Sequence, residues 1–408
     1  MKIEIITIGD ELLIGQVIDT NSAWMGQELT REGFEIKAIS SVGDKEDDII
    51  NALDIAFGRA DVVLLTGGVG PTKDDITKNT LCRYFHTSLV FNDEVLANIL
   101  QLFRQRDIQL NELTRNQAYV PEACKVIQNK AGTAPILWFQ KDEQVLVSMP
   151  GVPFEMKTAM TNDILPRLRS LYQPIHYLRR SFTVSGITES KLAMLLNDFE
   201  ETLPSGFSLA YLPSFGVIRL RLSAWGDRYA SEMSLQAHKL EGLLGALLIG
   251  ESEKALEGLL GEKLRQRHLS ISTAESCTGG HIAHRITLIP GASEYYKGSI
   301  VSYSNAVKED LLKVSPTLLQ TQGAVSREVA EQMARNVADR LKTDCSIAVS
   351  GIAGPDGGSE EKPVGTVWVC TFYHGETETQ CYHLGGNREE IILRTTQVAL
   401  MQMIRMIG

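Results

Sequence analysis

The stretch Asp61–Thr77, D-V-V-L-L-T-G-G-V-G-P-T-K-D-D-I-T, decides the fold of the N-terminal part of the chain. Its first five residues end in an uninterrupted apolar run, which is typical of a central parallel strand covered on both faces. The residues that follow supply glycines and carboxylates at the point where the strand would end. We therefore expect a buried parallel strand that runs into a ligand-binding turn.

The elements around this stretch alternate between strand and helix. Ile3–Ile8 and Phe34–Val42 read as strands, and Asn21–Glu32 reads as a helix that Gly33 ends. A second helix places apolar residues on one face, at Ile49, Leu53, Ala56 and Phe57. The order β-α-β-α-β predicts an α/β fold with a doubly wound open sheet, which binds ligands beyond the carboxyl ends of its strands.

The rest of the chain divides into two further segments. Residues 181–224 contain strands with alternating apolar and polar residues, which predicts a small α+β insert with a half-solvated sheet. Alternation then resumes with a helix at Ser252–Gln266, a strand at Leu269–Thr273 and a helix from Cys277, followed by a strand at Ser299–Tyr303. We expect domains at residues 1–170, 171–250 and 251–408.

Composition places the chain among ordinary globular proteins. Of its 408 residues 43% are hydrophobic and 22% are charged, so neither disorder nor a membrane class is indicated. The formal net charge of -10 disfavours nucleic acid as a partner, because phosphate contacts need clustered Lys and Arg.

Cysteine usage and the N-terminal segment predict a cytoplasmic location. The six cysteines form no C-x-x-C pair, which argues against a disulfide framework or a zinc site. Residues 1–15 include Glu4, Asp10 and Glu11, which do not fit the apolar core of a signal peptide. No later run of about 18 uncharged apolar residues occurs, so no membrane association is expected.

The first candidate site is the glycine-rich turn after the central strand. Gly67, Gly68 and Gly70 allow a phosphate group to approach the backbone closely, and Asp74 and Asp75 could hold a divalent cation beside it. Two further candidates for the same edge are Asp10, after the first strand, and Glu155, which follows a later strand and P-G. The alternative is that the glycines form a plain turn and the aspartates cap a helix.

The second candidate site is the stretch Ala274–Gly280, A-E-S-C-T-G-G, at the expected junction of a strand and a helix. A serine on such a turn has main-chain N–H groups beside it that can stabilise an oxyanion, so Ser276 is a candidate nucleophile for acyl transfer. Lys308 could act as its base if burial lowers the lysine pKa. The alternative is that Lys308 is an ordinary solvated lysine.

Histidine and cysteine are weaker candidates in this region. His281 and His284 are expected inside the helix, pointing away from its N-terminus, and H-x-x-H alone is poor evidence for a metal site. Cys277 is a rival nucleophile next to Ser276, but a neighbouring residue on a turn points elsewhere. We interpret Cys277 as a small buried side chain.

Several multi-residue motifs resemble those of the CinA family. In the N-terminal part they are G-D-E-L-L-I-G from Gly9, T-G-G-V-G-P-T-x-D-D-I-T from Thr66 and M-P-G-V-P-F-E-M from Met149. This resemblance implies a molybdopterin-binding-like domain with metal-dependent ADP-ribose pyrophosphatase activity. Thr66, Gly67, Gly68 and Gly70 would then contact the diphosphate, and Asp74, Asp75 and Asp10 would hold a divalent metal ion of unknown identity, with a monovalent cation as a further candidate.

The C-terminal motifs A-E-S-C-T-G-G, Y-S-N-A-V-K, S-G-I-A-G-P-D-G-G and K-P-V-G-T-V-W are similar to those of CinA-type nicotinamide-nucleotide amidohydrolases. The resemblance implies that Ser276 is acylated, that Lys308 is the base and that Tyr303 supports them. Ser350 stands where the family often has Thr. The remaining implied substrate contacts are Thr278, Gly279, Gly280, Gly351 and Arg388, and Arg388 suits a phosphate. No metal is needed for this chemistry.

The resemblance thus implies a bifunctional hydrolase that acts on nicotinamide mononucleotide and ADP-ribose, as a homodimer. The middle segment would be KH-like, but its G-x-x-G sequences at Gly242 and Gly258 contain leucines and no basic residue, so RNA binding is unsupported. Two alternatives stay open: a molybdopterin or adenylyl transferase, which leaves the C-terminal motifs unexplained, and a non-catalytic competence or DNA-damage interaction protein.

Overall fold

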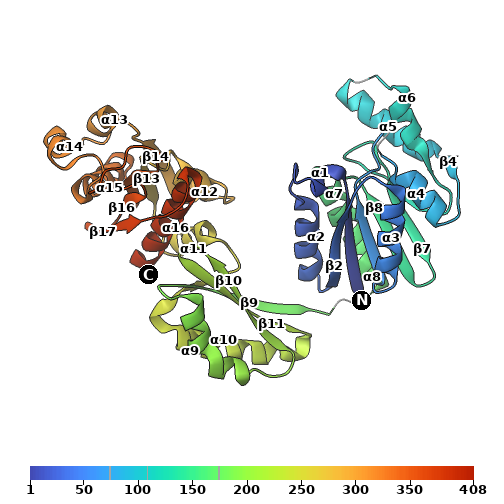
Figure 1. The fold of residues 1–408 in the computed structure, drawn as a ribbon, viewed down its shortest axis with the longest axis horizontal. Helices are drawn as coiled ribbons and strands as arrows, with labels where there is room; N and C mark the ends of the chain where they lie inside the picture. Colours follow the sequence, from blue (N-terminus) through green and yellow to red (C-terminus); the bar gives the residue numbers. More distant parts are fainter. Residues whose placement is uncertain (73–74, 108, 173–174) are drawn as a thin grey trace. The chain divides into compact units, whose positions relative to one another are not determined.

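The computed structural model describes residues 1–72, 75–107, 109–172 and 175–408. The chain forms two compact units, of which the first contains Met1–Leu178 with Trp225–Tyr229 and the second contains Arg179–Ala224 with Ala230–Gly408. Helices and strands alternate through most of both units (Figure 1), so the predicted α/β class is confirmed.

The first unit is built on a six-stranded sheet with the order β2-β1-β3-β8-β7-β6. The four strands from β2 to β8 are parallel, and β7 and β6 are antiparallel to their neighbours. Their bounds are β1 Lys2–Ile8, β2 Glu35–Val42, β3 Val62–Thr66, β6 Lys125–Ile127, β7 Ile136–Lys141 and β8 Gln144–Met149. A separate pair joins β4 (Leu89–Phe91) and β5 (Tyr119–Pro121).

Helices cover both faces of this sheet (Figure 1), because successive residues of its central strands point to opposite sides. Leu64 packs in one core with α2, and Val63 and Leu65 pack in the other with α3 and α4. The helices are α1 Asp10–Leu13, α2 Thr20–Arg31, α3 Glu46–Phe57, α4 Thr77–Tyr84, α5 Asp93–Arg106, α6 Glu112–Arg115, η1 Asn116–Ala118, α7 Pro153–Ala159, η2 Met160–Ile164 and α8 Leu165–Leu171. The predicted central strand therefore occupies the expected place.

A four-stranded sheet with the order β10-β11-β9-β12 occupies the middle of the chain. Leu220 and Leu222 on β11 are buried, whereas Arg219 and Arg221, which alternate with them, are half-buried, which matches the predicted alternation. The elements are β9 Tyr177–Ser185, α9 Glu189–Glu201, β10 Phe207–Ser214, β11 Val217–Trp225, η3 Asp227–Tyr229, α10 Ala230–Leu244, η4 Gly245–Leu247 and β12 Leu248–Glu251.

The C-terminal sheet has five strands in the order β14-β13-β15-β16-β17. β13 (Ile271–Glu275) runs parallel to β14 (Tyr296–Val301) and β15 (Cys345–Gly351), and β16 (Thr366–Tyr373) and β17 (Glu376–His383) are antiparallel. Apolar cores lie on both of its faces. The helices are α11 Leu256–Gln266, α12 His281–Thr287, η5 Ala292–Glu294, α13 Asn305–Asp310, α14 Pro316–Gln322, α15 Arg327–Leu341 and α16 Arg388–Met406.

Three predicted boundaries in this segment were wrong. The helix expected from Cys277 begins at His281, because residues 276–280 form a turn. The strand expected at Ser299–Tyr303 ends at Val301, so Tyr303 lies beyond it. The strand expected at Leu269–Thr273 is Ile271–Glu275, so Glu275 is the last residue of β13.

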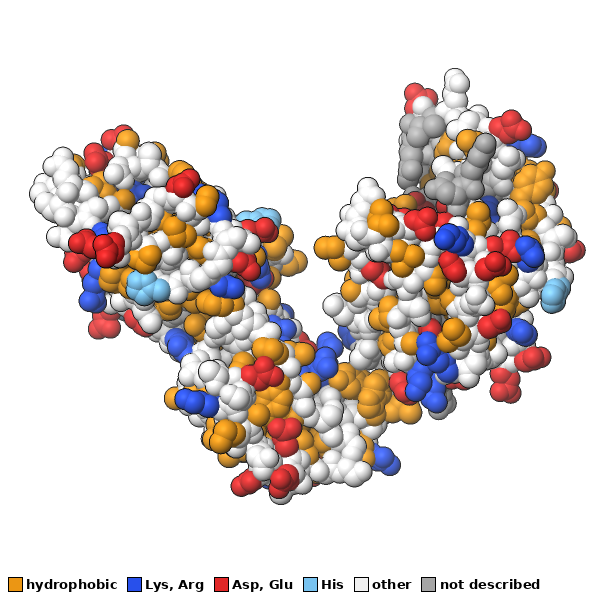
Figure 2. All heavy atoms as spheres, in the orientation of Figure 1, with side chains coloured by type: hydrophobic (Ala, Val, Ile, Leu, Met, Phe, Trp, Pro, Cys, Tyr) orange, Lys and Arg blue, Asp and Glu red, His pale blue; other side chains and the backbone are white. Residues whose placement is uncertain are grey.

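The surface mixes charges of both signs. On the face seen in Figure 2, Lys and Arg side chains are interspersed with Asp and Glu rather than gathered in one basic stripe. Within the described part of the chain, no helix combines the length and apolar character that crossing a membrane requires.

Candidate functional site

Three parallel strands of the C-terminal sheet bring the predicted catalytic residues to one edge. Ser276 directly follows β13, Tyr303 follows β14, and Ser350 lies at the end of β15. The Ser276 amide donates to the carbonyl of Val349 at 3.1 Å, which fixes the start of the turn against the neighbouring strand. This edge is where an open α/β sheet binds its ligands.

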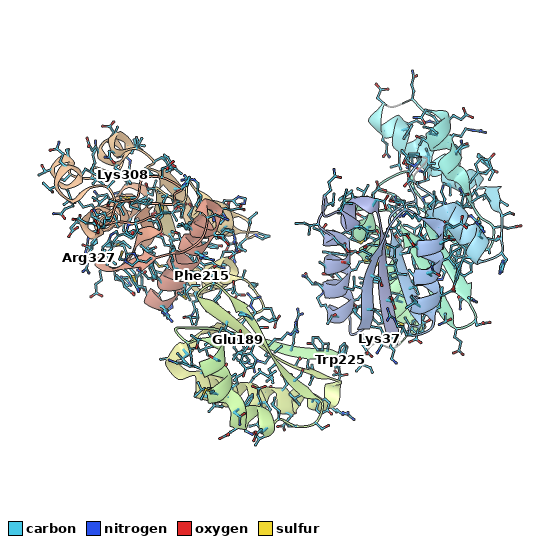
Figure 3. The ribbon with its side chains drawn as sticks, in the orientation of Figure 1. Lys37, Glu189, Phe215, Trp225, Lys308 and Arg327 are labelled. Atoms are coloured by element: carbon cyan, nitrogen blue, oxygen red, sulfur yellow. The ribbon has the colours of Figure 1, made fainter. Side chains whose placement is uncertain are left out.

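Lys308 contacts the Ser276 hydroxyl directly. Its Nζ lies 3.1 Å from Ser276 Oγ and 2.6 Å from the main-chain oxygen of Ser302. Lys308 stands on the short helix α13 (Figure 3) and is 1% exposed. Burial lowers its pKa below the ordinary 10.5, because desolvation disfavours the ammonium form. The solvated-lysine alternative is therefore wrong.

Glu275 organises the turn on which Ser276 stands. It is fully buried, and its carboxylate accepts hydrogen bonds from the main-chain N–H groups of Gly280, Ile282 and Ala283 at 2.8–3.1 Å. These groups lie at the start of α12, where N–H donors have no partner inside the helix. No role was assigned to Glu275 from the sequence alone. An acidic residue just before a serine and two glycines could have indicated a carboxylate that caps the start of the following helix.

The other residues of the turn have distinct surroundings. The Thr278 hydroxyl donates to Glu275 at 2.7 Å, so its proton is directed into the turn and not toward an oxyanion. Gly279 and Gly280 have φ of +59° and +100°, which explains glycine at both positions. A Cβ built on Gly279 would meet nothing within 4 Å, so space is open beside the turn.

Cys277 is the small buried side chain that the sequence predicted. It is 6% exposed, and burial raises the pKa of its thiol to about 12. A thiol with this pKa stays protonated near neutral pH, which removes the thiolate that a cysteine nucleophile needs.

Ser350 and Gly351 are held by contacts within the protein. The Ser350 hydroxyl donates to the carbonyl of Ala324 at 2.7 Å and so fixes the segment before α15. A Cβ on Gly351 would come within 2.9 Å of the carbonyl oxygen of Thr366, which indicates close strand packing. Both residues lie at the expected edge, but these contacts are with the protein framework.

Arg388 and Tyr303 meet at the surface of the same edge. Arg388 is the first residue of α16, and its guanidinium donates to the Tyr303 hydroxyl at 2.7 Å and to the Gly354 carbonyl at 2.6 Å. Tyr303 is 62% exposed. A capping box between Asn387 and Glu390 starts this helix. A cation and a hydroxyl are therefore presented to solvent, as a phosphate contact requires.

The two histidines lie on the predicted helix, although this helix begins at His281. His281 is the first residue of α12, and its Nδ1 lies 2.8 Å from the hydroxyl of Thr396. His284 is exposed on the same helix. The His281 contact does not involve the Ser276 hydroxyl, and the described residues contain no group of three or more His, Cys, Asp and Glu suited to a metal.

A second candidate site lies in the first unit, at the carboxyl ends of β1, β3 and β8. The N-terminal cavity, as we call it, has a volume of about 350 Å³. Its lining includes Ile8, Gly9, Glu11, Asp44, Gly67, Gly68, Val69, Gly70, Pro71, Asp75, Gln117, Thr133, Ala134, Pro150, Gly151, Val152 and Glu155. The glycine loop and Glu155 thus meet as the sequence predicted.

Two glycines of this loop are required because neighbouring atoms lie too close to the backbone to leave room for a Cβ atom. A Cβ on Gly67 would lie 2.2 Å from the carbonyl oxygen of Ile8, and one on Gly68 would lie 2.2 Å from the hydroxyl of Thr77. Both glycines have positive φ. Thr66 lines a neighbouring pocket and not the N-terminal cavity itself. Its hydroxyl donates to the Pro150 carbonyl at 2.8 Å.

The predicted metal ligands only partly converge. Asp75 lines the cavity, and its carboxylate accepts from the Thr72 main-chain N–H at 2.8 Å. Asp10 is exposed and is not among the residues that line the cavity, although its backbone contacts the Asp44 carboxylate. Glu11 and Asp44 line the cavity instead. Asp74 lies outside the described residues.

Family models match both parts of the chain. Residues 253–407 match the CinA C-terminal domain, and residues 4–170 match a domain described as "Probable molybdopterin binding domain". A CinA-like protein from Cytophaga hutchinsonii is 43% identical over 405 residues, which cover 98% of this chain and 97% of that protein. The chain belongs to the CinA family.

Other CinA-family proteins are similar over different lengths. A CinA-like protein from Flavobacterium psychrophilum is 41% identical over 408 residues, covering 98% of this chain and 97% of that protein. The crystal structure of a competence/damage inducible protein from Agrobacterium tumefaciens is 41% identical, with a TM-score of 0.36, and covers 37% of this chain and 94% of that one.

Proposed function

We propose that the C-terminal part of this CinA-family protein is an amidase that converts nicotinamide mononucleotide into nicotinate mononucleotide and ammonia. The observation that carries the proposal is the contact between Lys308 Nζ and Ser276 Oγ at 3.1 Å, with the lysine buried and its pKa lowered. A neutral lysine in this position can accept the serine proton, which a solvated lysine cannot do near pH 7.

The reaction divides into acylation and deacylation. Lys308 takes the proton of Ser276 while Oγ bonds to the carboxamide carbon, and main-chain N–H groups of the turn stabilise the tetrahedral oxygen. The C–N bond then breaks, and Lys308 returns the proton to the leaving nitrogen, so ammonia departs and an ester of Ser276 remains. Water activated by Lys308 cleaves that ester and releases the nicotinate product.

The outer contacts suit a phosphorylated substrate. Arg388 and Tyr303 share a hydrogen bond near the exposed side of the site, and the guanidinium has a planar fork that matches phosphate oxygens. We assign them to the phosphate of the nucleotide. Gly279, with open space beside it, leaves room for the pyridine ring near Ser276.

The test is ammonia release from nicotinamide mononucleotide by the purified full chain. Wild type should release ammonia, and Ser276→Ala should lose at least ~10³-fold of that rate, since the nucleophile is removed. Ser315→Ala, at the start of α14, serves as the matched control and should keep the rate. Equal release by wild type and Ser276→Ala would contradict the proposal.

For the N-terminal cavity we propose metal-dependent hydrolysis of the diphosphate of ADP-ribose. Among the described residues that line the cavity four are acidic, namely Glu11, Asp44, Asp75 and Glu155, and none is Lys or Arg. A diphosphate would be repelled by this lining unless a cation bound with it. The glycine loop supplies the close backbone approach that a phosphate needs.

The carboxylates fit a magnesium-like ion, which takes one or two protein carboxylates together with phosphate oxygens and water. Asp75 and Glu11 would hold the ion. When bound, it would neutralise charge on the diphosphate and polarise the bond to be cleaved. The loop Gly67–Gly70 orients the diphosphate, and Glu155 is fixed by Asn129 at 2.7 Å, facing the same space.

This second activity is tested with ADP-ribose, with and without divalent cations. Turnover should require the cation and should fall in Asp75→Asn but not in Asp142→Asn, which alters an exposed residue of the same domain. Turnover without cations would contradict the metal role. Transfer of adenylyl to an acceptor instead of water would favour the transferase alternative, and inactivity of both sites would favour the non-catalytic one. The homodimer and the cytoplasmic location stay predictions.

A further inference from the structure

Gln117 is the one side chain, among the described residues of the N-terminal cavity, whose polar groups are both buried and unpartnered. It lies on η1 (Asn116–Ala118) and is 1% exposed. Neither its Nε2 nor its Oε1 has a hydrogen-bond partner in the described part of the chain. Because Gln117 lines the cavity, the proposed function leaves an amide donor and an amide acceptor unused there.

A buried side-chain amide without hydrogen-bond partners is unfavourable. Asn129, in the same domain, provides a comparison because its buried amide has a structural role. Leaving such a group unpaired costs roughly 1–3 kcal/mol, so native proteins rarely do it without a reason. Asn129, which is 3% exposed, uses its whole side chain: Nδ2 donates to Ala134 and Glu155, and Oδ1 accepts from Ala131 and Gly132. Gln117 has no such framework role for its side chain.

The backbone that bears Gln117 is held in place. Lys78, a buried residue of α4, donates to the main-chain oxygens of Gln117 and Tyr119, both at 3.3 Å. The next residue, Ala118, is fully buried, and its carbonyl accepts from Asn92 at 2.8 Å. The amide is therefore carried by a segment tied to the helix that follows the glycine loop.

We propose that Gln117 reads an adenine base in the N-terminal cavity. The inference rests on the proposed function, because ADP-ribose supplies the base. A glutamine amide presents a donor and an acceptor side by side, and the N7 edge of adenine presents the complementary pair, its N6 amine and N7. In hypoxanthine, a carbonyl oxygen replaces the amine, so both groups on this edge are acceptors and the amide oxygen of Gln117 has no donor to pair with in either orientation.

The test compares adenine and hypoxanthine ligands on the full chain with the cation present. Binding of AMP and IMP is measured by calorimetry, and turnover is measured with ADP-ribose and its inosine analogue. Wild type should favour adenine by about 10-fold or more in Kd and in KM, within the range for a bidentate base contact. Gln117→Met should bring both ratios close to one, and Gln140→Met, at an exposed position of β7, should keep the wild-type ratios.

The outcomes separate this inference from the proposed function. If wild type hydrolyses ADP-ribose but treats adenine and hypoxanthine alike, or if Gln117→Met keeps the preference, the inference is overturned and the hydrolase proposal stands. If AMP is preferred over IMP through Gln117 but ADP-ribose is not hydrolysed, only the hydrolase proposal fails. Absence of binding by both nucleotides overturns the inference. Folding is checked by the melting temperature, which should not fall in Gln117→Met because no hydrogen bond is lost.

Discussion

The two candidate sites share a position at the carboxyl ends of parallel strands but differ in how complete they are. At the Ser276 site, nucleophile and base touch, and both are buried. In the N-terminal cavity, carboxylates, a glycine loop and the Gln117 amide surround an open volume. The first arrangement has its chemistry built into side chains, whereas the second needs a ligand and a cation to balance its charge.

Each unit also contains a buried lysine, and the comparison shows why burial alone does not make a base. Lys308 and Lys78 both have pKa values lowered by desolvation, Lys78 to about 8. Lys308 contacts the Ser276 hydroxyl, whereas the contacts of Lys78 are the main-chain oxygens of Gln117 and Tyr119. Catalysis by lysine requires the neighbouring nucleophile as well as the shifted pKa.

The largest expected effect is the loss of the base at the Ser276 site. Lys308→Met keeps the side-chain length but cannot accept a proton, so ammonia release should fall by about 10²–10⁴-fold. The measurement is the steady-state rate at saturating nicotinamide mononucleotide. Lys313→Met, at an exposed position after α13, is the control. If Lys308→Met released ammonia at the wild-type rate, Lys308 would not be the base, and it would not differ from Lys78 in this respect.

The second-largest expected effect is that metal chelation abolishes one of the two activities and leaves the other unchanged. Removal of divalent cations with EDTA should reduce ADP-ribose turnover to background, because the acidic cavity then repels the diphosphate. The same treatment should leave ammonia release unchanged, because the proposed acyl transfer uses Ser276 and Lys308. Both activities are measured on one preparation and again after Mg²⁺ is restored. If EDTA reduced both activities equally, the two sites would not differ in their need for a divalent cation.

Lys78 should affect stability and its pH dependence. Because its folded pKa of about 8 is below the ordinary 10.5, the unfolded chain binds more protons between these values, and stability rises with pH in that window. The free energy of unfolding of wild type should therefore rise relative to Lys78→Met by about 3 kcal/mol from pH 8 to 10.5. Denaturant titration at several pH values measures this difference, and a pH-independent difference would refute the assignment.

Glu275→Gln should produce the smallest of these effects. The amide keeps one acceptor but turns an NH₂ group toward the N–H donors of the turn, which should lower the free energy of unfolding by about 1–3 kcal/mol. The rate of ammonia release should fall with it, since Ser276 is positioned by this turn. Glu328→Gln, on the exposed side of α15, is the matched control. Unchanged stability would mean that the carboxylate does not organise the turn.

The sequence predicted much of the fold because its apolar patterns are strong. The run at Val62–Leu65 is buried on both sides, as expected for a central parallel strand. The Ser276 and Lys308 pair could be proposed from motifs, but its contact depends on the packing of β13 against β14. Glu275 was missed because its partners are main-chain groups of a helix start that the sequence placed four residues too early.

Gln117 illustrates a different limit of sequence reasoning. Its importance comes from the lack of a hydrogen-bond partner for its side chain among the residues that the structure describes, and a single glutamine in N-Q-A carries no pattern that would reveal this. The metal ligands show the same limit, since Asp10 and Asp75 both follow strands but only Asp75 lines the cavity.

The most direct test of the central claim is to stop wild-type turnover of nicotinamide mononucleotide in acid and map the acylated peptide by mass spectrometry. The account predicts an ester on Ser276 that is absent from Ser276→Ala and from Lys308→Met. Acylation of Cys277, or rapid ammonia release by a chain that never carries an acyl group on Ser276, would contradict it.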